Sequence, residues 1–199
     1  MTFSIVARKN KSLGIGVVSG SVAVGDRVPW MKGGVGAIAT QGYTETRYGR
    51  EGLRLLEEGL GPSYVLKKLL QEDFSPERRQ VAILSADGRK AVHTGSFCPP
   101  TRSSEDRKNY ICIGNMLKSE RVIPKMAEAF GKRGKLWKRI LSALEAGAEA
   151  GGDRRGDQTA AILVRNEESL DVKIDYSQNS LRDLRKGILE ALSVMNSGL

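Results

Sequence analysis

Thr2 stands at the head of a strand-like run, and its hydroxyl is a candidate nucleophile. The stretch TFSIVAR alternates between two sets of side chains in the way that is typical of a sheet strand. A small residue at position 2 normally allows the initiator Met1 to be removed. Thr2 would then carry a free α-amine beside its hydroxyl, and an adjacent amine is one way to activate a weak oxygen nucleophile. The alternative, that Thr2 is simply the first residue of a strand, stays open.

A second candidate site lies in the stretch IGNMLKSE, where a predicted strand ends at Gly114 and Asn115 and a helix follows shortly afterwards. Backbone amides at such a junction, together with the Asn115 side chain, can hold an anion or stabilise an oxyanion. A plain turn in which the asparagine caps the helix is the other interpretation.

The third candidate is the charged loop in AGGDRRGDQTAAILV, where Asp153, Arg154 and Asp157 stand directly before a predicted strand. Buried ends of strands rarely carry several charges unless these are paired. Two interpretations stay open, a structural Arg–Asp pairing and a role beside a site. In the second interpretation, Asp153, Arg154 and Asp157 are candidate site residues.

Several common chemistries have no support in the sequence. It contains no nucleophile elbow, no P-loop and no dinucleotide-binding motif, since the glycines of GIGVVSG do not open a helix. The single histidine, His93, lies in an alternating strand and is interpreted as structural. Cys98 and Cys112 lack the spacing of zinc ligands and of a disulfide scaffold. We therefore expect no metal and no cofactor.

The composition is typical of a globular protein. With 199 residues, 40% of them hydrophobic, we expect one domain spanning residues 1–199. No apolar run approaches the ~20 residues of a membrane-spanning helix, and the start lacks the pattern of a secretory signal, so we expect a cytoplasmic protein without a membrane partner. The net charge of +9 raises the question of nucleic acid. However, the densest basic stretch, GKRGKLWKRI, overlies apolar residues at helical spacing, which favours a solvated helix face.

The predicted elements alternate between groups of strands and pairs of helices. Paired strands with short turns favour antiparallel sheets. The predicted fold class is α+β, a four-layer α-β-β-α sandwich of two mostly antiparallel sheets covered by helix pairs. The expected elements are strands over 2–8, 13–19 and 35–41, a helix ending near Gly59, a helix beginning at Pro62, a hairpin over 79–95 with its turn at Asp87-Gly88, a polar segment PPTRSSEDRKN, a strand YICIG, two helices, strands QTAAILVR and LDVKIDY, and a closing helix.

Motifs spread across nearly the whole chain support a resemblance to a known family. In order they are MTFSIVAR, AVG followed by VPW, GVGAIATQ, YGREGL, RQVAILSADGR, HTG, GNML, MAEAF, ALEAGAEAGGDRRGDQTAAILV and LRDLRK. With these motifs the chain resembles an uncharacterised bacterial and archaeal family, a domain of unknown function with the Ntn-hydrolase-like fold. More distantly, it resembles the N-terminal-nucleophile (Ntn) hydrolases, which include the proteasome β subunits.

The resemblance implies a mechanism and a set of site residues. The free amine of Thr2 would take the proton of the Thr2 hydroxyl, whose oxygen would attack an amide carbonyl, and backbone N–H groups would stabilise the oxyanion. The resemblance places Gln41 and Gly42 in the loop that usually supplies these N–H groups.

The resemblance also assigns roles to residues far from Thr2 in the sequence. It implies that Asn115 lies near the nucleophile, that Asp153 supports the α-amine, and that Ser19 stands near the position of a supporting acid. Proteasome-type members also use a buried lysine, for which Lys32 is an approximate counterpart.

We therefore predict an amidohydrolase that acts on a small amide or peptide substrate. The alternative is a catalytically inactive Ntn-like module that binds a small anionic ligand or a protein partner, so whether the chain is an enzyme stays open. A retained Met1 would block the amine and exclude the mechanism. Nucleic-acid binding through the face over 132–139 is a third, disfavoured hypothesis. We also expect a homo-oligomer.

Overall fold

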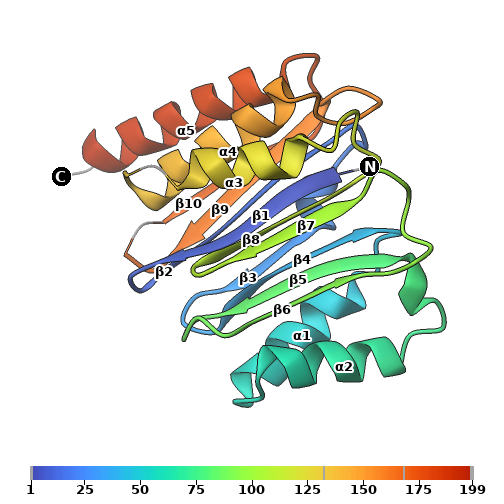
Figure 1. The fold of residues 1–199 in the computed structure, drawn as a ribbon. Helices are drawn as coiled ribbons and strands as arrows, with labels where there is room; N and C mark the ends of the chain where they lie inside the picture. The colour runs from blue at the N-terminus through green and yellow to red at the C-terminus, as the bar shows by residue number, and fades with distance from the viewer. Residues whose placement is uncertain (1, 132, 168, 198–199) are drawn as a thin grey trace.

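Two antiparallel sheets lie face to face in the computed structural model, which describes residues 2–131, 133–167 and 169–197 (Figure 1). The six-stranded sheet has the order β10-β9-β2-β1-β8-β7, and the four-stranded sheet has the order β3-β4-β5-β6. The strands are β1 Thr2–Lys9, β2 Ser12–Ser19, β3 Pro29–Lys32, β4 Gly36–Gly42, β5 Arg79–Ser85, β6 Lys90–Thr94, β7 Ser103–Arg107, β8 Tyr110–Asn115, β9 Thr159–Arg165 and β10 Leu170–Ile174. The helices are α1 Arg47–Glu57, α2 Pro62–Gln71, α3 Val122–Phe130, α4 Leu136–Glu149 and α5 Ser180–Ser197, with short 3₁₀ turns at Val24–Asp26 and Pro76–Arg78.

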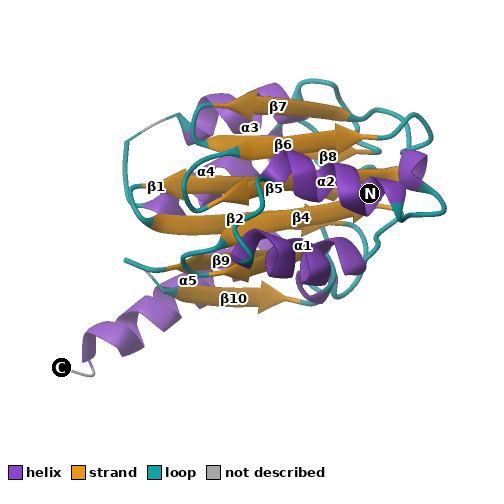
Figure 2. Cartoon of the chain, turned by 90° about the horizontal axis from the view of Figure 1, so that it is seen from below, coloured by secondary structure: helices purple, strands orange, loops and turns teal. Residues whose placement is uncertain are grey.

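Three hydrophobic layers hold the sandwich together. One lies between the two sheets, and the other two lie between each sheet and its helices. Helices α1 and α2 lie across the outer face of the four-stranded sheet, as Figure 2 shows. Helices α3, α4 and α5 cover the six-stranded sheet, so one expected helix pair is a group of three. The predicted fold class, a four-layer α-β-β-α sandwich, is confirmed.

The glycines of GIGVVSG serve the close approach of a helix. A Cβ atom at Gly14 would lie 2.4 Å from Cδ1 of Ile140, and one at Gly16 would lie 2.5 Å from Cγ2 of the same residue. Without side chains at these positions, α4 packs directly on the backbone of β2. This packing explains a glycine-rich stretch that lacks the spacing of a dinucleotide-binding loop.

Two edge strands were absent from the sequence prediction. The segment PPTRSSEDRKN was expected to be only a polar connection, but β7 lies within it and pairs with β8 at the edge of the six-stranded sheet. Strand β3 begins at Pro29 and pairs with β4 at the edge of the other sheet. Edge strands tolerate charged residues and proline because one side of the strand has no partner. They therefore lack the alternation that identifies an inner strand.

The buried face of α4, His93 and Cys98 belong to the scaffold. Trp137, Ile140 and Leu144 of α4 are buried beneath its basic face, as the helical spacing predicted. His93 Nε2 lies 3.0 Å from the Pro76 carbonyl oxygen, a contact that suits a structural histidine. Cys98 is buried and unpaired, and burial raises the pKa of its thiol to about 11. No helix in the described part of the chain has the length and apolarity needed to cross a bilayer.

Candidate functional site around Thr2

The apolar layer between the two sheets becomes polar at one end. Strands β1 and β5 begin at this end, and strands β2, β4 and β8 end there. Side chains two residues apart on a strand point to the same face, so these positions continue the rows that form the inter-sheet core. Six buried polar residues occupy them: Thr2, Ser4, Ser19, Gln41, Gln80 and Asn115.

Gln80 determines how this network is oriented. Its Nε2 donates to two backbone carbonyls, Ser103 O at 3.1 Å and Gly114 O at 3.0 Å, so the amide cannot be reversed. Its Oε1 is therefore the acceptor for Gln41 Nε2 at 2.8 Å and for Asn115 Nδ2 at 3.0 Å. These contacts join the six-stranded sheet to the four-stranded sheet beside Thr2.

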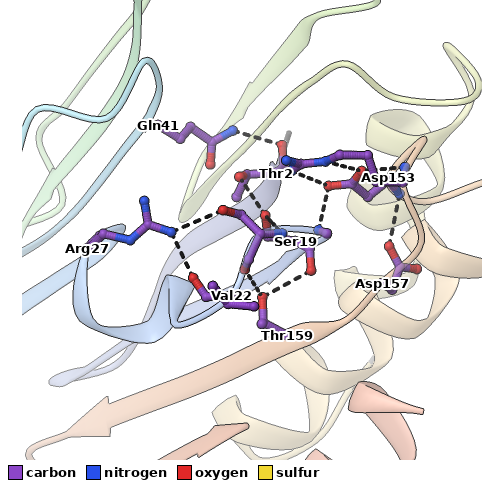
Figure 3. A network of polar contacts seen from close by, with 11 residues as sticks. Thr2, Ser19, Val22, Arg27, Gln41, Asp153, Asp157 and Thr159 are labelled. Atoms are coloured by element: carbon purple, nitrogen blue, oxygen red, sulfur yellow. Dashed lines mark hydrogen bonds and ion pairs between the residues drawn. The ribbon is translucent and has the colours of Figure 1, made fainter. Parts of the chain in front are cut away.

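Thr2 is held by residues from two other strands, Ser19 of β2 and Gln41 of β4. Its Oγ1 lies 3.2 Å from Ser19 Oγ, and its carbonyl accepts a hydrogen bond of 3.1 Å from Gln41 Nε2 (Figure 3). The same Gln41 side chain accepts a bond of 2.6 Å from Ser4 Oγ. Thr2 is only 5% exposed, so its hydroxyl lies inside the end of the sandwich. Met1 lies outside the described residues, and the expectation of its removal is not addressed by the structure.

Ser19 is anchored by the chain that follows it. Its hydroxyl oxygen accepts a bond of 3.1 Å from the backbone N–H of Ser21, and its carbonyl accepts bonds from the Thr159 hydroxyl and from the backbone N–H of Gln158. Arg27 Nη2 donates to Ser21 Oγ at 3.2 Å. Figure 3 shows Arg27 bonded to the loop that follows Ser19, including the Val22 carbonyl. A cation is therefore connected to the Thr2 hydroxyl through two serines.

Asn115 faces Thr2 from the neighbouring strand. The two residues are direct partners in the pairing of β1 with β8, so their side chains share the inter-sheet face. Asn115 is fully buried, and its Nδ2 is used by Gln80. Its Oδ1 has no hydrogen-bond partner within the described residues. Buried acceptors without a donor are uncommon in folded proteins.

The charged loop reaches the same end of the sandwich. A bridge between Leu117 and Asp153 draws it to the end of β8, and the buried Asp153 carboxylate accepts 2.6 Å and 2.8 Å bonds from the backbone N–H groups of Gly20 and Arg155. The Arg155 guanidinium adds an ion pair of 3.4 Å. Through the bond to the Gly20 N–H, Asp153 fixes the position of Gly20, the residue that follows Ser19.

The two other candidates in this loop occupy different environments. Asp157 accepts a bond of 2.9 Å from the backbone N–H of Asp153 and lies beneath Gly152, and burial raises the pKa of its carboxyl. Arg154 is exposed and donates to Thr101 Oγ1 at 3.0 Å. The loop thus combines a structural carboxylate with a surface arginine.

Two expected placements are wrong. The resemblance placed Gln41 and Gly42 in a loop, but both belong to β4, because they pair with Gln80 and Arg79 of β5. The strand expected over 35–41 already included Gln41, and the sheet continues through Gly42. Lys32 is exposed at the end of β3 and forms an ion pair with Glu57, so it is not a buried lysine.

The residues that sequence reasoning missed include Ser4, Gln80 and Arg27. Ser4 and Gln80 could have been found, because each is a polar residue in phase with the buried residues of an apolar strand. Arg27 has no such signal. Its relation to Ser19 depends on the course of the loop between β2 and β3.

Within the described ranges, no group of three or more His, Cys, Asp or Glu residues could hold an ion. A hollow of about 580 Å³ lies away from Thr2, between α2 and β6, and is lined by residues such as Leu66, Leu70 and Val92.

Comparisons with known proteins place the chain in a family. The model for the "Family of unknown function (DUF1028)" matches residues 2–184. Among solved structures, protein SPO2555 from Silicibacter pomeroyi, described with the same family model, aligns at a TM-score of 0.89 and 30% identity over 96% of this chain and 88% of that chain. Anbu (ancestral beta-subunit) from Yersinia bercovieri aligns at a TM-score of 0.44 and 11% identity over 99% of this chain and 97% of that chain. No curated protein shows a significant match.

Proposed function

We propose that this chain, which belongs to the DUF1028 family of unknown function, is an amidohydrolase that uses Thr2 as an N-terminal nucleophile on a small amide or peptide substrate. The observation that carries the proposal is the contact of 3.2 Å between Thr2 Oγ1 and Ser19 Oγ. Two buried hydroxyls in contact at a strand end, with the Thr2 carbonyl also held by Gln41, give the nucleophile one fixed orientation.

The unpartnered oxygen of Asn115 supports the requirement for a free amine. An unsatisfied buried acceptor costs about 1–3 kcal/mol. Asn115 Oδ1 lies on the residue directly opposite Thr2, where the α-amine would appear once Met1 is removed. That amine can donate to Oδ1, so processing of the chain would supply the missing donor.

The proposed reaction needs only Thr2 and water. The α-amine accepts the proton of Oγ1–H, and Oγ1 forms a bond to the amide carbon of the substrate. The C–N bond then breaks, the leaving amine takes that proton, and water hydrolyses the resulting ester to release the acid. Gln41 and Gly42 stay candidates for the oxyanion site, with Gly42 turning the chain at a φ of 84°.

A second candidate function is an inactive module that binds a small anionic ligand or a protein partner. The exposed position of Lys32 favours it, because the lysine expected to activate the nucleophile is absent from the site. A homo-oligomeric state and a cytoplasmic location stay predictions from the sequence.

The test combines the mass of the purified protein with chemical labelling. We expect a mass that lacks Met1 and covalent labelling of Thr2 by a hydroxyl-reactive electrophile. Thr2→Ala should abolish the label, Thr2→Ser should retain it, and Thr44→Ala should leave it unchanged. A retained Met1, or labelling that survives Thr2→Ala, would exclude Thr2 as the nucleophile and leave the inactive module.

A further inference from the structure

Three arginines on three different loops surround the Thr2 end of the sandwich. Arg27 lies between β2 and β3, Arg102 precedes β7, and Arg154 lies between α4 and β9. Neutral oxygens hold each guanidinium. Arg102 donates to the carbonyls of Cys98 and Ser96. Arg27 donates to Ser21 Oγ and the Val22 carbonyl, and Arg154 donates to Thr101 Oγ1.

These arginines carry positive charge that the protein itself does not neutralise. Within the described ranges, no carboxylate oxygen lies within 4.0 Å of the three guanidinium groups. Elsewhere in the described part of the chain, some arginines, such as Arg50 and Arg139, also lack a carboxylate partner, and others have one. Examples are Arg47 with Glu72, Arg79 with Asp73, Arg165 with Asp171 and Arg185 with Glu145.

Each arginine is attached to a segment that borders Thr2. Arg27 binds Ser21, whose N–H binds Ser19 Oγ. Arg154 binds Thr101, whose carbonyl accepts from Leu117 N, two residues beyond Asn115. Arg102 donates to the carbonyl of Cys98. Cys98 lies beside Gly42 at the end of β4, since a Cβ atom added at Gly42 would lie 3.2 Å from Cys98 Sγ. The three guanidinium groups are therefore attached to segments that adjoin the Thr2 end of the sandwich, next to the Arg155–Asp153 ion pair.

One nitrogen of the Arg27 guanidinium keeps its donors free within the described part of the chain, while Nε lies 3.5 Å from the Ala23 carbonyl oxygen. Nη2 of Arg27 donates to Ser21 Oγ and, at 2.8 Å, to the Val22 carbonyl, whereas no acceptor among the described residues binds Nη1. The free Nη1 can donate a charge-assisted hydrogen bond to a carboxylate.

We infer that the substrate is an amide that bears a carboxylate and that Arg27 binds this carboxylate, with Arg102 and Arg154 adding to the attraction. This inference rests on the proposed function, because it assigns the substrate class of the Thr2 site. A neutral or cationic amide would leave the three arginines without a counter-charge and would bind more weakly.

The test uses glutaryl-p-nitroanilide and its neutral counterpart, in which a carboxamide replaces the carboxylate. Binding is measured by calorimetry at constant ionic strength in the full chain carrying Thr2→Ala, so the result does not depend on turnover. We expect the charged probe to bind at least about tenfold more tightly, since charge-assisted hydrogen bonds are the stronger ones. Arg27→Ala added to this protein should remove most of that preference, and Arg154→Ala should reduce it less.

The controls separate this inference from the proposal on which it rests. Arg89, an exposed arginine in the β5–β6 turn at the opposite end, should tolerate replacement by alanine without loss of the preference. If Arg27→Ala does not fold, Arg27→Gln keeps a donor without the charge and serves instead. Equal binding of the two probes, no binding of either, or a preference that survives loss of Arg27 would overturn the inference. Failure of Thr2 labelling in the otherwise unaltered protein would instead contradict the nucleophile alone.

Discussion

Asn115 Nδ2 donates a hydrogen bond of 3.0 Å to Gln80 Oε1, and this bond joins the six-stranded sheet to the four-stranded sheet. Gln41 donates to the same oxygen, while the Gln80 amide nitrogen binds the carbonyl of Gly114, the residue before Asn115. Gln80 is therefore the common partner in a buried network that positions the segments around Thr2.

Replacement of Gln80 by leucine should destabilise the fold strongly. The change removes the partner of two buried amide donors and of two backbone carbonyls, so we expect a loss of about 2–4 kcal/mol in the free energy of unfolding, measured with urea. Gln71→Ala, at the exposed end of α2, should cost less than about 0.5 kcal/mol. A Gln80 variant as stable as the Gln71 variant would contradict this account.

Ser19→Ala should impair the chemistry of Thr2 more than the fold. It removes the oxygen that contacts Thr2 Oγ1 and that accepts the Ser21 N–H bond. We expect the rate of Thr2 labelling to fall about 10–100-fold, in the range of lost positioning contacts, while circular dichroism stays unchanged. Ser12, a buried serine at the other end of β2, gives the matched control, and its alanine variant should label at the normal rate. Equal rates in both variants would remove Ser19 from the site.

Gly49→Ala tests the packing of α1 on β3. A Cβ atom at this position would lie 2.0 Å from Cγ of Trp30, so the helix or the indole must move. We expect a loss of at least about 2 kcal/mol in thermal or urea unfolding. Gly61→Ala is the comparison, because its Cβ would meet only the flexible end of Arg89 at 2.9 Å. A tolerated Gly49→Ala would mean that α1 sits farther from the sheet.

The Asp73–Arg79 pair should stabilise the protein down to acidic pH. Hydrogen bonds from Arg79 hold the pKa of Asp73 at about 2, below its ordinary value of 3.8, and the Tyr48 hydroxyl also donates to this carboxylate. Because the folded-state pKa is lowered, the stabilisation is complete above the unfolded pKa, and it disappears as the pH falls from about 4 to about 2.

Asp73→Asn should therefore lower the free energy of unfolding by about 2 kcal/mol at pH 7 and by much less near pH 2, as measured by urea unfolding across this range. Asp26→Asn breaks an exposed pair with Lys173 and should change stability by less than about 0.5 kcal/mol at any pH. A constant difference between the Asp73 variant and the unaltered protein would argue against a titrating Asp73.

Local sequence patterns determined the inner strands, most helices and the order of the layers. Alternation identified β1, Pro62 marked the start of α2, and Asp87-Gly88 marked the β5–β6 turn. Each of these signals acts within a few residues of chain, which is why they survive without tertiary information. The same local patterns could not reveal β3 and β7, because an edge strand needs no buried alternation.

Some features of the candidate site were also visible in the sequence, and others required the tertiary structure. The types of Thr2, Asn115 and Asp153 and their places at element ends were visible in the sequence. Only the tertiary structure decided that Asn115 lies opposite Thr2, that Gln80 links the sheets, and that Arg27 binds Ser21, whose N–H binds Ser19. The physical reason is that strand register and loop course depend on the packing of side chains far apart in the chain, and no single segment specifies that packing.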